Sequence, residues 1–331
     1  MVKIYPEKLK PGDRVRIIAP ARSMAIISKE LTEIANRRFA DLGLELSFGN
    51  HVMKKNDSLS SSIESRVQDI HDAFCDKKIK AVITVVGGFN SNQLLKYLDW
   101  QLIKENPKIF CGYSDITALS NAFFKKTGLV TYYGPHYSSF GQKLYFDYTF
   151  EYFKKCVMEN NPFEISPSDN WTDDYWYVDQ DKRELIKNEG WQVINEGRSG
   201  GTILGGNLCT FNLLQGTEYF PEAGKVILFI EDDKFGGEST DEEFDRNLQS
   251  LIHMPQFESV DGIMIGRFQK ASKMTPDKIS KIIKSKKELN NMPVVVDADF
   301  GHTDPKFTFP IGGEAILSAD NGKIKLKILK H

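Results

Sequence analysis

The sequence predicts an α/β protein with two domains: a mostly parallel sheet covered by helices at residues 1–165, and a second, strand-rich α/β domain at residues 166–331. Three observations favour this class. The chain has 331 residues, more than a single hydrophobic core usually accommodates. In its first half, short apolar runs alternate with amphipathic runs, which is typical of parallel sheets with right-handed crossovers. Beyond about residue 160 the pattern changes to a polar stretch with tryptophans, followed by glycine pairs and apolar strands.

Hydrophobic periodicity defines the elements of the first half. We expect strands at 13–19, 81–86, 109–111 and 129–132, and helices at 29–42, 65–75, 91–99 and 115–126. Gly87 and Gly88 end the second strand, and Asn90 or Ser91 is suited to cap the helix SNQLLKYLD that follows. Because ligands bind beyond the carboxyl ends of parallel strands, functional side chains are expected where a strand passes into a helix.

The second half is richer in strands. Pro162, Pro167, Trp171, Trp176 and Trp191 lie in an acidic stretch with weak periodicity. Beyond it, we expect strands at 226–230, 262–265, 294–296, 315–317 and 324–329, with the clearest helix at 240–252. The change of pattern places a domain boundary near residue 165.

Composition excludes several classes of function. The formal net charge of -2 gives no general attraction to nucleic acid or to an anionic membrane. The N-terminus lacks a signal-peptide pattern, and no apolar run approaches the roughly 18 residues of a transmembrane helix, so we expect a cytoplasmic protein. The scattered cysteines show no C-x-x-C spacing, which argues against a zinc site or a disulfide framework. They are Cys75, Cys111, Cys156 and Cys209.

A serine between a short strand and a helix is the most informative feature. Ser114 lies in KIFCGYSDITALSNAFFKK, two residues after Gly112. Such a turn holds a nucleophilic hydroxyl clear of the sheet, while the N–H groups of the following helix face a developing oxyanion. The match to G-x-S-x-G is incomplete, because Ile116 occupies the last position. The alternative is that Ser114 or Asp115 only caps the helix.

A nucleophilic serine needs a base and an acid. His302, in DADFGHTDP after an apolar strand, is the best candidate for the base, and His136 is second. Loops at strand ends commonly present catalytic groups, although a lone histidine is more often a hydrogen-bonded loop residue. Glu231 ends the strand VILFI and is suited to fix the imidazole tautomer. The order serine, acid, histidine is known for triads on α/β scaffolds.

An oxyanion hole requires two donors. The N–H of Asp115 is the natural first donor, and the glycine pair of VVGGFN allows a second backbone donor to approach a substrate. A rival interpretation is a divalent-metal hydrolase, although no H-E-x-x-H or D-x-[DN]-x-[DN]-G spacing supports it. Its ligands would come from Asp232, Asp233, Asp297, Asp299 and His302.

Several spaced motifs together resemble the serine peptidases that comprise LD-carboxypeptidases and microcin C immunity proteins. They are LKPGDRVRIIAPA, VVGGFNSNQLLKYLD, CGYSDITAL, GGTILGGNL, FIED and FGHTDP, and they span nearly the whole chain. The resemblance implies a Rossmann-like N-terminal domain, a strand-rich C-terminal domain and a homodimer. The expected serine mechanism needs no metal or organic cofactor. The resemblance also implies a catalytic triad of Ser114, Glu231 and His302, with the backbone of Gly88 and Asp115 forming the oxyanion hole.

Within this family, GGFNSNQLL is closer to the immunity branch, because the LD-carboxypeptidases tend to have GGYG here. The resemblance implies that a tryptophan of the segment WTDDYWY stacks on a nucleobase, and Trp176 or Trp171 is the candidate. Burial in an interface is an equally good explanation of either residue. Asn207 is a candidate substrate contact, or a turn residue of the second domain.

The resulting expectation is a serine carboxypeptidase-type hydrolase that cleaves an amide-type bond in small peptides or in aminoacyl- or peptidyl-nucleotides. Two alternatives remain open beside the metal hydrolase. One is an LD-carboxypeptidase that acts on murein tetrapeptides. The other is a non-catalytic protein that binds peptides or nucleotides, although all three residue types of the triad are present.

Overall fold

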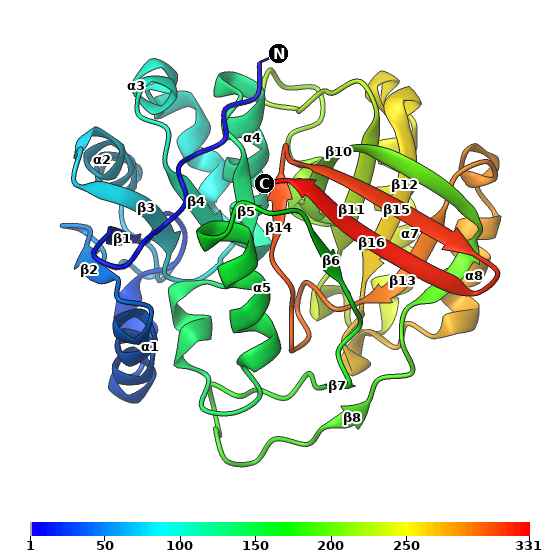
Figure 1. Cartoon of the computed structure of the whole chain (residues 1–331), viewed down its shortest axis with the longest axis horizontal. Coiled ribbons are helices and arrows are strands. Elements are labelled where there is room, and N and C mark those ends of the chain that lie inside the picture. The colour runs from blue at the N-terminus through cyan, green and yellow to red at the C-terminus, as the bar shows by residue number, and fades with distance from the viewer. Residues whose placement is uncertain (1) are drawn as a thin grey trace.

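The computed structural model describes residues 2–331 and contains two large sheets that lie side by side (Figure 1). The first sheet has six strands in the order β14-β5-β4-β3-β1-β2. Strands β1 to β5 pair in parallel, and β14 pairs antiparallel with β5. The strands are β1 (Arg14–Ile18), β2 (Glu45–Phe48), β3 (Ile79–Thr84), β4 (Ile109–Gly112), β5 (Thr131–Tyr133) and β14 (Phe309–Ile311).

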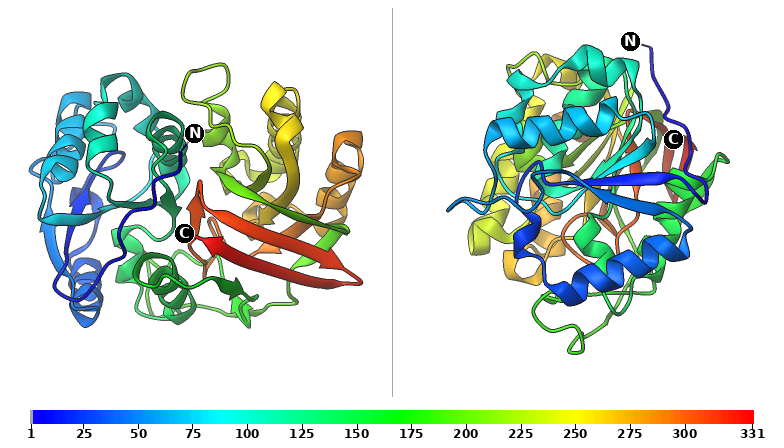
Figure 2. Two further views of the ribbon diagram at one scale, coloured as in Figure 1. Left: turned by 45° about the horizontal axis from the view of Figure 1, so that its top comes forward. Right: turned by 90° about the vertical axis from the view of Figure 1, so that its left-hand side faces the viewer.

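Helices cover both faces of the first sheet, with α1 on one face and α2 on the other (Figure 2). Serine caps begin both helices: Ser28 accepts the N–H of Leu31, and Ser62 accepts that of Ser65, which satisfies N–H groups that the first turn leaves free. The α-helices of this half are α1 (Lys29–Asp41), α2 (Ile63–Cys75), α3 (Trp100–Glu105), α4 (Thr117–Thr127) and α5 (Asp147–Met158).

The second sheet has eight strands in the order β6-β16-β15-β10-β11-β12-β13-β9. Its central strands β10 to β13 are parallel, and the others pair antiparallel. The strands are β6 (Phe163–Ile165), β9 (Gln192–Asn195), β10 (Gly197–Asn207), β11 (Val226–Glu231), β12 (Val260–Gly266), β13 (Val294–Ala298), β15 (Glu314–Asp320) and β16 (Lys323–Lys330). The accompanying helices are α6 (Leu208–Asn212), α7 (Thr240–Ile252) and α8 (Pro276–Lys284).

Short elements connect the longer strands and helices along the described chain. A two-stranded sheet joins β7 (Asn170–Trp171) to β8 (Ile186–Lys187). The 3-10 helices are η1 (Met24–Ile26), η2 (Ser91–Tyr97), η3 (Ser114–Ile116), η4 (Tyr137–Gly141), η5 (Lys234–Ser239), η6 (Pro255–Ser259), η7 (Lys270–Ser272) and η8 (Lys287–Leu289). No helix within residues 2–331 has the length and hydropathy that crossing a membrane requires.

The predicted α/β class, with a mostly parallel first sheet and a strand-rich second part, is confirmed. The helix expected at 91–99 is wrong in type, because η2 is a 3-10 helix. Asn90 makes no side-chain cap there; its side chain bonds Ser60 and Arg66 instead. Two strands do not follow a division of the sequence at residue 165. Strand β6 precedes this position but belongs to the second sheet, and β14 follows it but belongs to the first. A division of the chain at residue 165 therefore stays a prediction.

Aromatic packing joins the two sheets near the ends of their strands. Tyr133 of β5 stacks on Phe309 of β14 with ring centroids 4.9 Å apart. Phe309 in turn lies 4.8 Å from Phe229 of β11. All three rings are buried, and large aromatic side chains dominate the energetics of such contacts. This packing fixes the carboxyl end of β11 against the carboxyl ends of β4 and β5.

Candidate active site

Ser114 lies in the turn between β4 and α4, with a backbone φ of 60°. A positive φ is unusual for a residue with a side chain, and it directs the hydroxyl away from the sheet. The alternative, in which Ser114 or Asp115 only caps the helix, does not match the structure. The N-cap positions of η3 and α4 are Tyr113 and Ile116, neither of which makes a side-chain cap.

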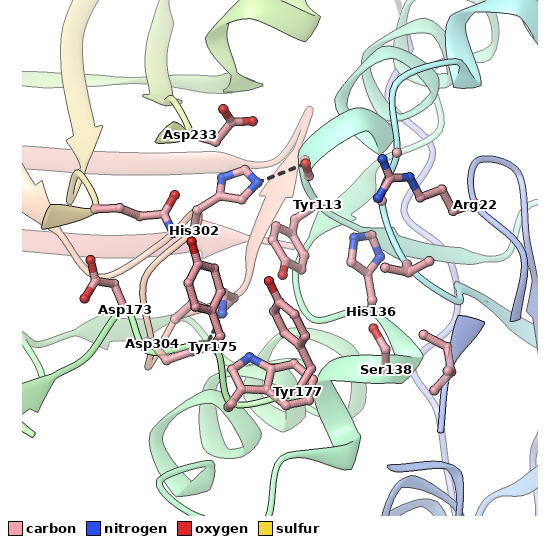
Figure 3. A pocket seen from close by; sticks show the side chains of 18 of the residues that line it. Arg22, Tyr113, His136, Ser138, Asp173, Tyr175, Tyr177, Asp233, His302 and Asp304 are labelled. Carbon is pink, nitrogen blue, oxygen red and sulfur yellow. Dashed lines mark hydrogen bonds and ion pairs between the residues drawn. The ribbon is translucent and has the colours of Figure 1, made fainter. Parts of the chain in front are cut away.

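The structure brings Ser114, His302 and Glu231 into one hydrogen-bonded chain. His302 Nε2 lies 3.0 Å from Ser114 Oγ, the contact that the dashed line from His302 marks in Figure 3. On the other side of the ring, His302 Nδ1 lies 2.7 Å from Glu231 Oε2. Glu231 is the last residue of β11 and is fully buried. His302 follows Gly301, whose φ is +95°. A Cβ at Gly301 would stand 2.6 Å from Glu231 Oε2, so only glycine leaves room for the carboxylate.

Tyr133 is a member of the site that the sequence did not indicate. Its hydroxyl donates to Glu231 Oε1 at 2.6 Å and accepts the N–H of Ser114 at 3.2 Å. One side chain of β5 thus links the turn that carries the serine to the acid of the second sheet. Nothing in the local pattern of LVTYYG distinguishes this tyrosine from a core residue.

The charges of the site favour an ionised acid and a readily protonated base. Burial would raise the pKa of Glu231, but His302 and hydrogen bonds from His302, Tyr133 and Asn207 outweigh it and lower that pKa. Burial would lower the pKa of His302, but Glu231 outweighs it and raises that pKa. Burial, with Glu231 and Asp233 nearby, raises the pKa of Asp232 to about 7. Of the two neighbouring carboxyl groups at this strand end, Glu231 therefore ionises more readily than Asp232.

The loop after β3 is attached to the residue that follows Ser114. The carboxylate of Asp115 accepts the N–H groups of Asn90 at 3.1 Å and Ser91 at 2.9 Å. The hydroxyl of Ser91 donates to the carbonyl of Asp115 at 2.7 Å. These bonds hold Gly88, which lines the same cavity as Ser114, in a fixed place relative to the turn.

A cavity of about 590 Å³ opens in front of Ser114 and His302. Trp176 lines it together with Tyr175 and Tyr177, from the segment between β7 and β8 (Figure 3). The other two candidate substrate contacts lie elsewhere. The ring of Trp171 packs beneath the guanidinium of Arg267 at 5.0 Å. Asn207 is buried, where it caps α6 by accepting the N–H of Thr210 and lies 3.4 Å from Asp232.

His136, the second candidate base, also faces the cavity but lies apart from the acid. It is 1% exposed, and its Nδ1 lies 2.7 Å from the hydroxyl of Thr84. Its Nε2 is buried without a hydrogen-bond partner. Burial, with His302 and Lys306 nearby, holds the pKa of His136 well below its usual value, so the ring is neutral.

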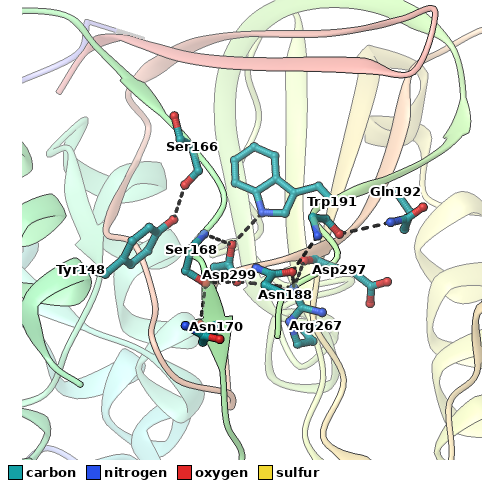
Figure 4. A network of polar contacts seen from close by, with 11 residues as sticks. Tyr148, Ser166, Ser168, Asn170, Asn188, Trp191, Gln192, Arg267, Asp297 and Asp299 are labelled. Atoms are coloured by element: carbon teal, nitrogen blue, oxygen red, sulfur yellow. Dashed lines mark hydrogen bonds and ion pairs between the residues drawn. The ribbon is translucent and has the colours of Figure 1, made fainter. Parts of the chain in front are cut away.

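The ligands of the alternative metal site are not gathered. Within residues 2–331, no group of three or more His, Cys, Asp or Glu side chains is placed to hold a metal ion. Asp299 instead accepts hydrogen bonds from Trp191 at 2.8 Å and Ser168 at 3.0 Å (Figure 4). Its network attaches the segment before β9 to the strand end that precedes His302.

Comparisons with known proteins give matches over most of the chain. Two family models match the chain: the LD-carboxypeptidase N-terminal domain over residues 15–134, and the LD-carboxypeptidase C-terminal domain over residues 200–317. The putative carboxypeptidase YocD of Bacillus subtilis is 52% identical over 328 residues, which cover 99% of this chain and 100% of the relative.

Solved structures give the same result. The MccF-like protein of Bacillus anthracis superposes with a TM-score of 0.97 at 51% identity, covering 99% of this chain and 100% of that chain. The structure of MccF in complex with glutamyl sulfamoyl guanosine superposes with a TM-score of 0.86 at 27% identity, covering 98% of each chain. The predicted resemblance is confirmed: this chain belongs to the LD-carboxypeptidase family of serine hydrolases, which includes MccF-like proteins.

Proposed function

We propose that this protein is a carboxypeptidase-type hydrolase in which Ser114 is the nucleophile, His302 the general base and Glu231 the acid of the triad. The observation that carries the proposal is the chain of two hydrogen bonds, of 3.0 Å and 2.7 Å, from the Ser114 hydroxyl through His302 to Glu231. A hydroxyl, an imidazole and a carboxylate in this order form the arrangement that activates serine in unrelated hydrolases.

The mechanism follows from these contacts. Ser114 Oγ attacks the scissile carbonyl carbon while its proton passes to His302 Nε2, and Glu231 stabilises the imidazolium. The proton then moves to the leaving nitrogen as the carbon–nitrogen bond breaks. Water, deprotonated by His302, cleaves the acyl-enzyme and restores the hydroxyl. No metal or organic cofactor takes part in these steps.

Backbone N–H groups of Gly88 and Asp115 stabilise the oxyanion in this proposal. Two observations support them. Gly88 lines the cavity beside Ser114, and the Asp115 carboxylate holds the loop that carries Gly88 through Asn90 and Ser91. Donors fixed before the reaction are worth more than mobile ones, because no reorganisation is needed when the charge develops.

The substrate class is small peptides or aminoacyl- or peptidyl-nucleotides. The aromatic wall of the cavity supports the nucleotide members of this class, because Trp176 lines the cavity and bases commonly stack on aromatic side chains. The MccF structure in complex with glutamyl sulfamoyl guanosine supports the same choice. A homodimer stays a prediction of the resemblance, and a cytoplasmic location stays a prediction of the sequence pattern.

A comparison of substrates tests the proposal. Purified protein is incubated with glutamyl sulfamoyl guanosine and, separately, with a murein tetrapeptide, and the released amino acid is quantified. Faster hydrolysis of the nucleotide supports the immunity-like function, and release of D-alanine from the tetrapeptide favours the LD-carboxypeptidase. Binding without hydrolysis of either compound would favour the non-catalytic alternative and contradict the proposed mechanism.

A further inference from the structure

Arg22 is a cation without a polar partner at the wall of the candidate active site. It lines the cavity together with Gly87, Gly88 and Ser114. Its Nε is buried and has no hydrogen-bond partner. Within residues 2–331, its guanidinium makes no hydrogen bond or ion pair with another side chain. An arginine held in this way is suited to bind an anion that the protein itself does not supply.

The other charged groups of the cavity wall already have partners. Lys306 pairs with Asp304, and Lys234 contacts the hydroxyl and the ring of Tyr175. The acids are occupied as well: Asp173 pairs with Lys270 at 3.2 Å, and Asp233 accepts the N–H of Phe235 at 2.8 Å. Of the three cations that line this part of the described structure, Arg22 is therefore the one whose guanidinium has no polar side-chain partner.

Arg22 and Ser114 are positioned by neighbouring glycines. A Cβ at Gly88 would stand 3.3 Å from Arg22 Cγ, and a Cβ at Gly87 would stand 3.3 Å from Ser114 Oγ. The backbone N–H of Arg22 also donates to the carbonyl of Gly87 at 3.3 Å. The side chain of Arg22 extends into the cavity from the wall that faces His302 (Figure 3). Arg22 and Ser114 thus border the same Gly87–Gly88 loop and line the same cavity.

An arginine in the same cavity as the proposed nucleophile fits the chemistry of a carboxypeptidase substrate, which carries an anion a few bonds from the scissile carbonyl. In a terminal residue, three bonds separate the scissile carbonyl carbon from the carboxylate carbon: C–N, N–Cα and Cα–C. Standard bond lengths place these two carbons about 3–4 Å apart. In an ionised acyl sulfamate, the negative charge lies on the leaving nitrogen itself and is shared with the sulfonyl oxygens, so it is closer still. Both compounds carry an anion on the leaving side of the bond.

We propose that Arg22 binds the anion of the leaving group and selects substrates whose leaving nitrogen carries a carboxylate or a sulfamate nearby. The proposal rests on the hydrolase function proposed above and identifies the part of the substrate that the site recognises. The unpartnered Nε2 of His136 lies 3.4 Å from the position that a Cβ on Gly87 would occupy. Because this imidazole is neutral, it adds no positive charge to the cavity. Arg22 is therefore the source of the attraction.

Two pairs of compounds test this inference. The first is a murein tetrapeptide with a free terminal carboxylate and the same peptide with a terminal amide. The second is glutamyl sulfamoyl guanosine and the glutamyl amide of 5′-amino-5′-deoxyguanosine, which lacks the sulfonyl group. We measure kcat/KM for each compound with the wild type, Arg22→Gln, Arg22→Lys and the control Arg37→Gln. Arg37 is exposed on α1 and does not line the cavity.

Arg22→Gln is expected to lower kcat/KM for the charged member of one pair by about 10- to 100-fold, the range of a lost charge-assisted hydrogen bond. It should change the neutral member much less. Arg22→Lys should recover part of the loss, because lysine keeps the charge but not the planar fork, and Arg37→Gln should leave the ratio unchanged. The affected pair identifies the anion. Equal losses for both members, or no loss for either pair, would overturn the proposal.

Binding separates this inference from the proposed function. In the Ser114→Ala background, affinities for the same pairs are measured by calorimetry with and without Arg22→Gln. If the wild type hydrolyses none of the compounds, the hydrolase proposal fails. A preference for the charged member that disappears with Arg22→Gln would still support the anion site, and an equal affinity for both members of each pair would reject it.

Discussion

The hydroxyl of Tyr133 donates to Glu231 at 2.6 Å and accepts the backbone N–H of Ser114 at 3.2 Å. The same tyrosine thus contacts the proposed acid of the triad and the turn that carries the proposed nucleophile. Tyr133 belongs to β5, which lies beside β4, and its ring packs against β11 through Phe309 and Phe229. Tyr133 therefore couples the two halves of the site.

Tyr133→Phe is predicted to lower kcat by about 10- to 100-fold, the effect of removing a hydrogen bond to a charged group, with little change in KM. The pKa of Glu231 should rise, because Tyr133 is one of the donors that lower it. Steady-state kinetics and thermal unfolding distinguish this effect from a loss of fold. Tyr132→Phe is the matched control, since the hydroxyl of Tyr132 contacts Lys8 at 3.2 Å and not the site. Similar kinetics for the two variants would contradict the role of Tyr133.

Activity is predicted to fall as the pH is lowered, and the midpoint of this loss is expected at a pH above 6.5. The base must be neutral to accept a proton, and the influence of Glu231 on the buried ring raises the pKa of His302 above its ordinary value of 6.5. Activity is therefore fully present above the raised pKa and is lost as the pH falls through it. A profile of kcat/KM against pH measures this acid limb, the part of the curve in which activity falls as the pH is lowered.

Glu231→Gln should shift the same limb to lower pH. Without the negative charge, the remaining effect of burial lowers the pKa of His302, and the residual activity should persist to more acidic conditions. An acid limb that does not move, or that moves to higher pH, would show that His302 is not the group that titrates.

Gly301→Ala is predicted to damage both the fold and the site. The φ of +95° costs a residue with a side chain about 1–2 kcal/mol, and the new methyl group would displace the carboxylate of Glu231. Gly12→Ala is a matched control, because Gly12 has a φ of +92° with no atom within 4 Å of the added Cβ. Chemical denaturation should show a lower free energy of unfolding for both variants than for the wild type. Activity of the folded fraction should be lost in Gly301→Ala alone.

Trp176→Ala is predicted to raise KM for a nucleotide substrate by about 5- to 100-fold, the equivalent of the roughly 1–3 kcal/mol of a base stacking interaction. A peptide without a base should be affected much less. Trp171→Ala is the comparison, because that ring packs on Arg267 and does not line the cavity. If both variants raise KM equally, stacking on Trp176 is not the reason.

Local patterns predicted the elements that depend on local physics. The helix expected at 240–252 matches α7, and the strand expected at 226–230 ends one residue before β11 does. By contrast, β10 was not expected, because its sequence GRSGGTILGGN is rich in glycine, a weak strand former. Pairing with β11 on one side and β15 on the other stabilises it. Likewise, no local signal places Phe309–Ile311 beside β5 in the first sheet.

The candidate site shows the same division. Ser114, Glu231 and His302 each lie at the end of a strand or in the loop after one, so the pattern of strands indicated them as candidates. Tyr133 and Arg22 carry no such signal, because their roles depend on which strands and loops become neighbours in the fold. Trp171 and Trp176 belong to one aromatic segment, and only the path of the chain between β7 and β8 separates their environments.

The most direct test of the central claim is to identify the residue that forms a covalent bond with a serine-directed probe. The protein is treated with a fluorophosphonate, digested and analysed by mass spectrometry, and hydrolysis of glutamyl sulfamoyl guanosine and the tetrapeptide is measured for Ser114→Ala in parallel. We predict a single adduct on Ser114, weaker labelling of His302→Ala, and a loss of turnover by several orders of magnitude in Ser114→Ala. An adduct on a different residue, or undiminished hydrolysis by Ser114→Ala, would contradict the account.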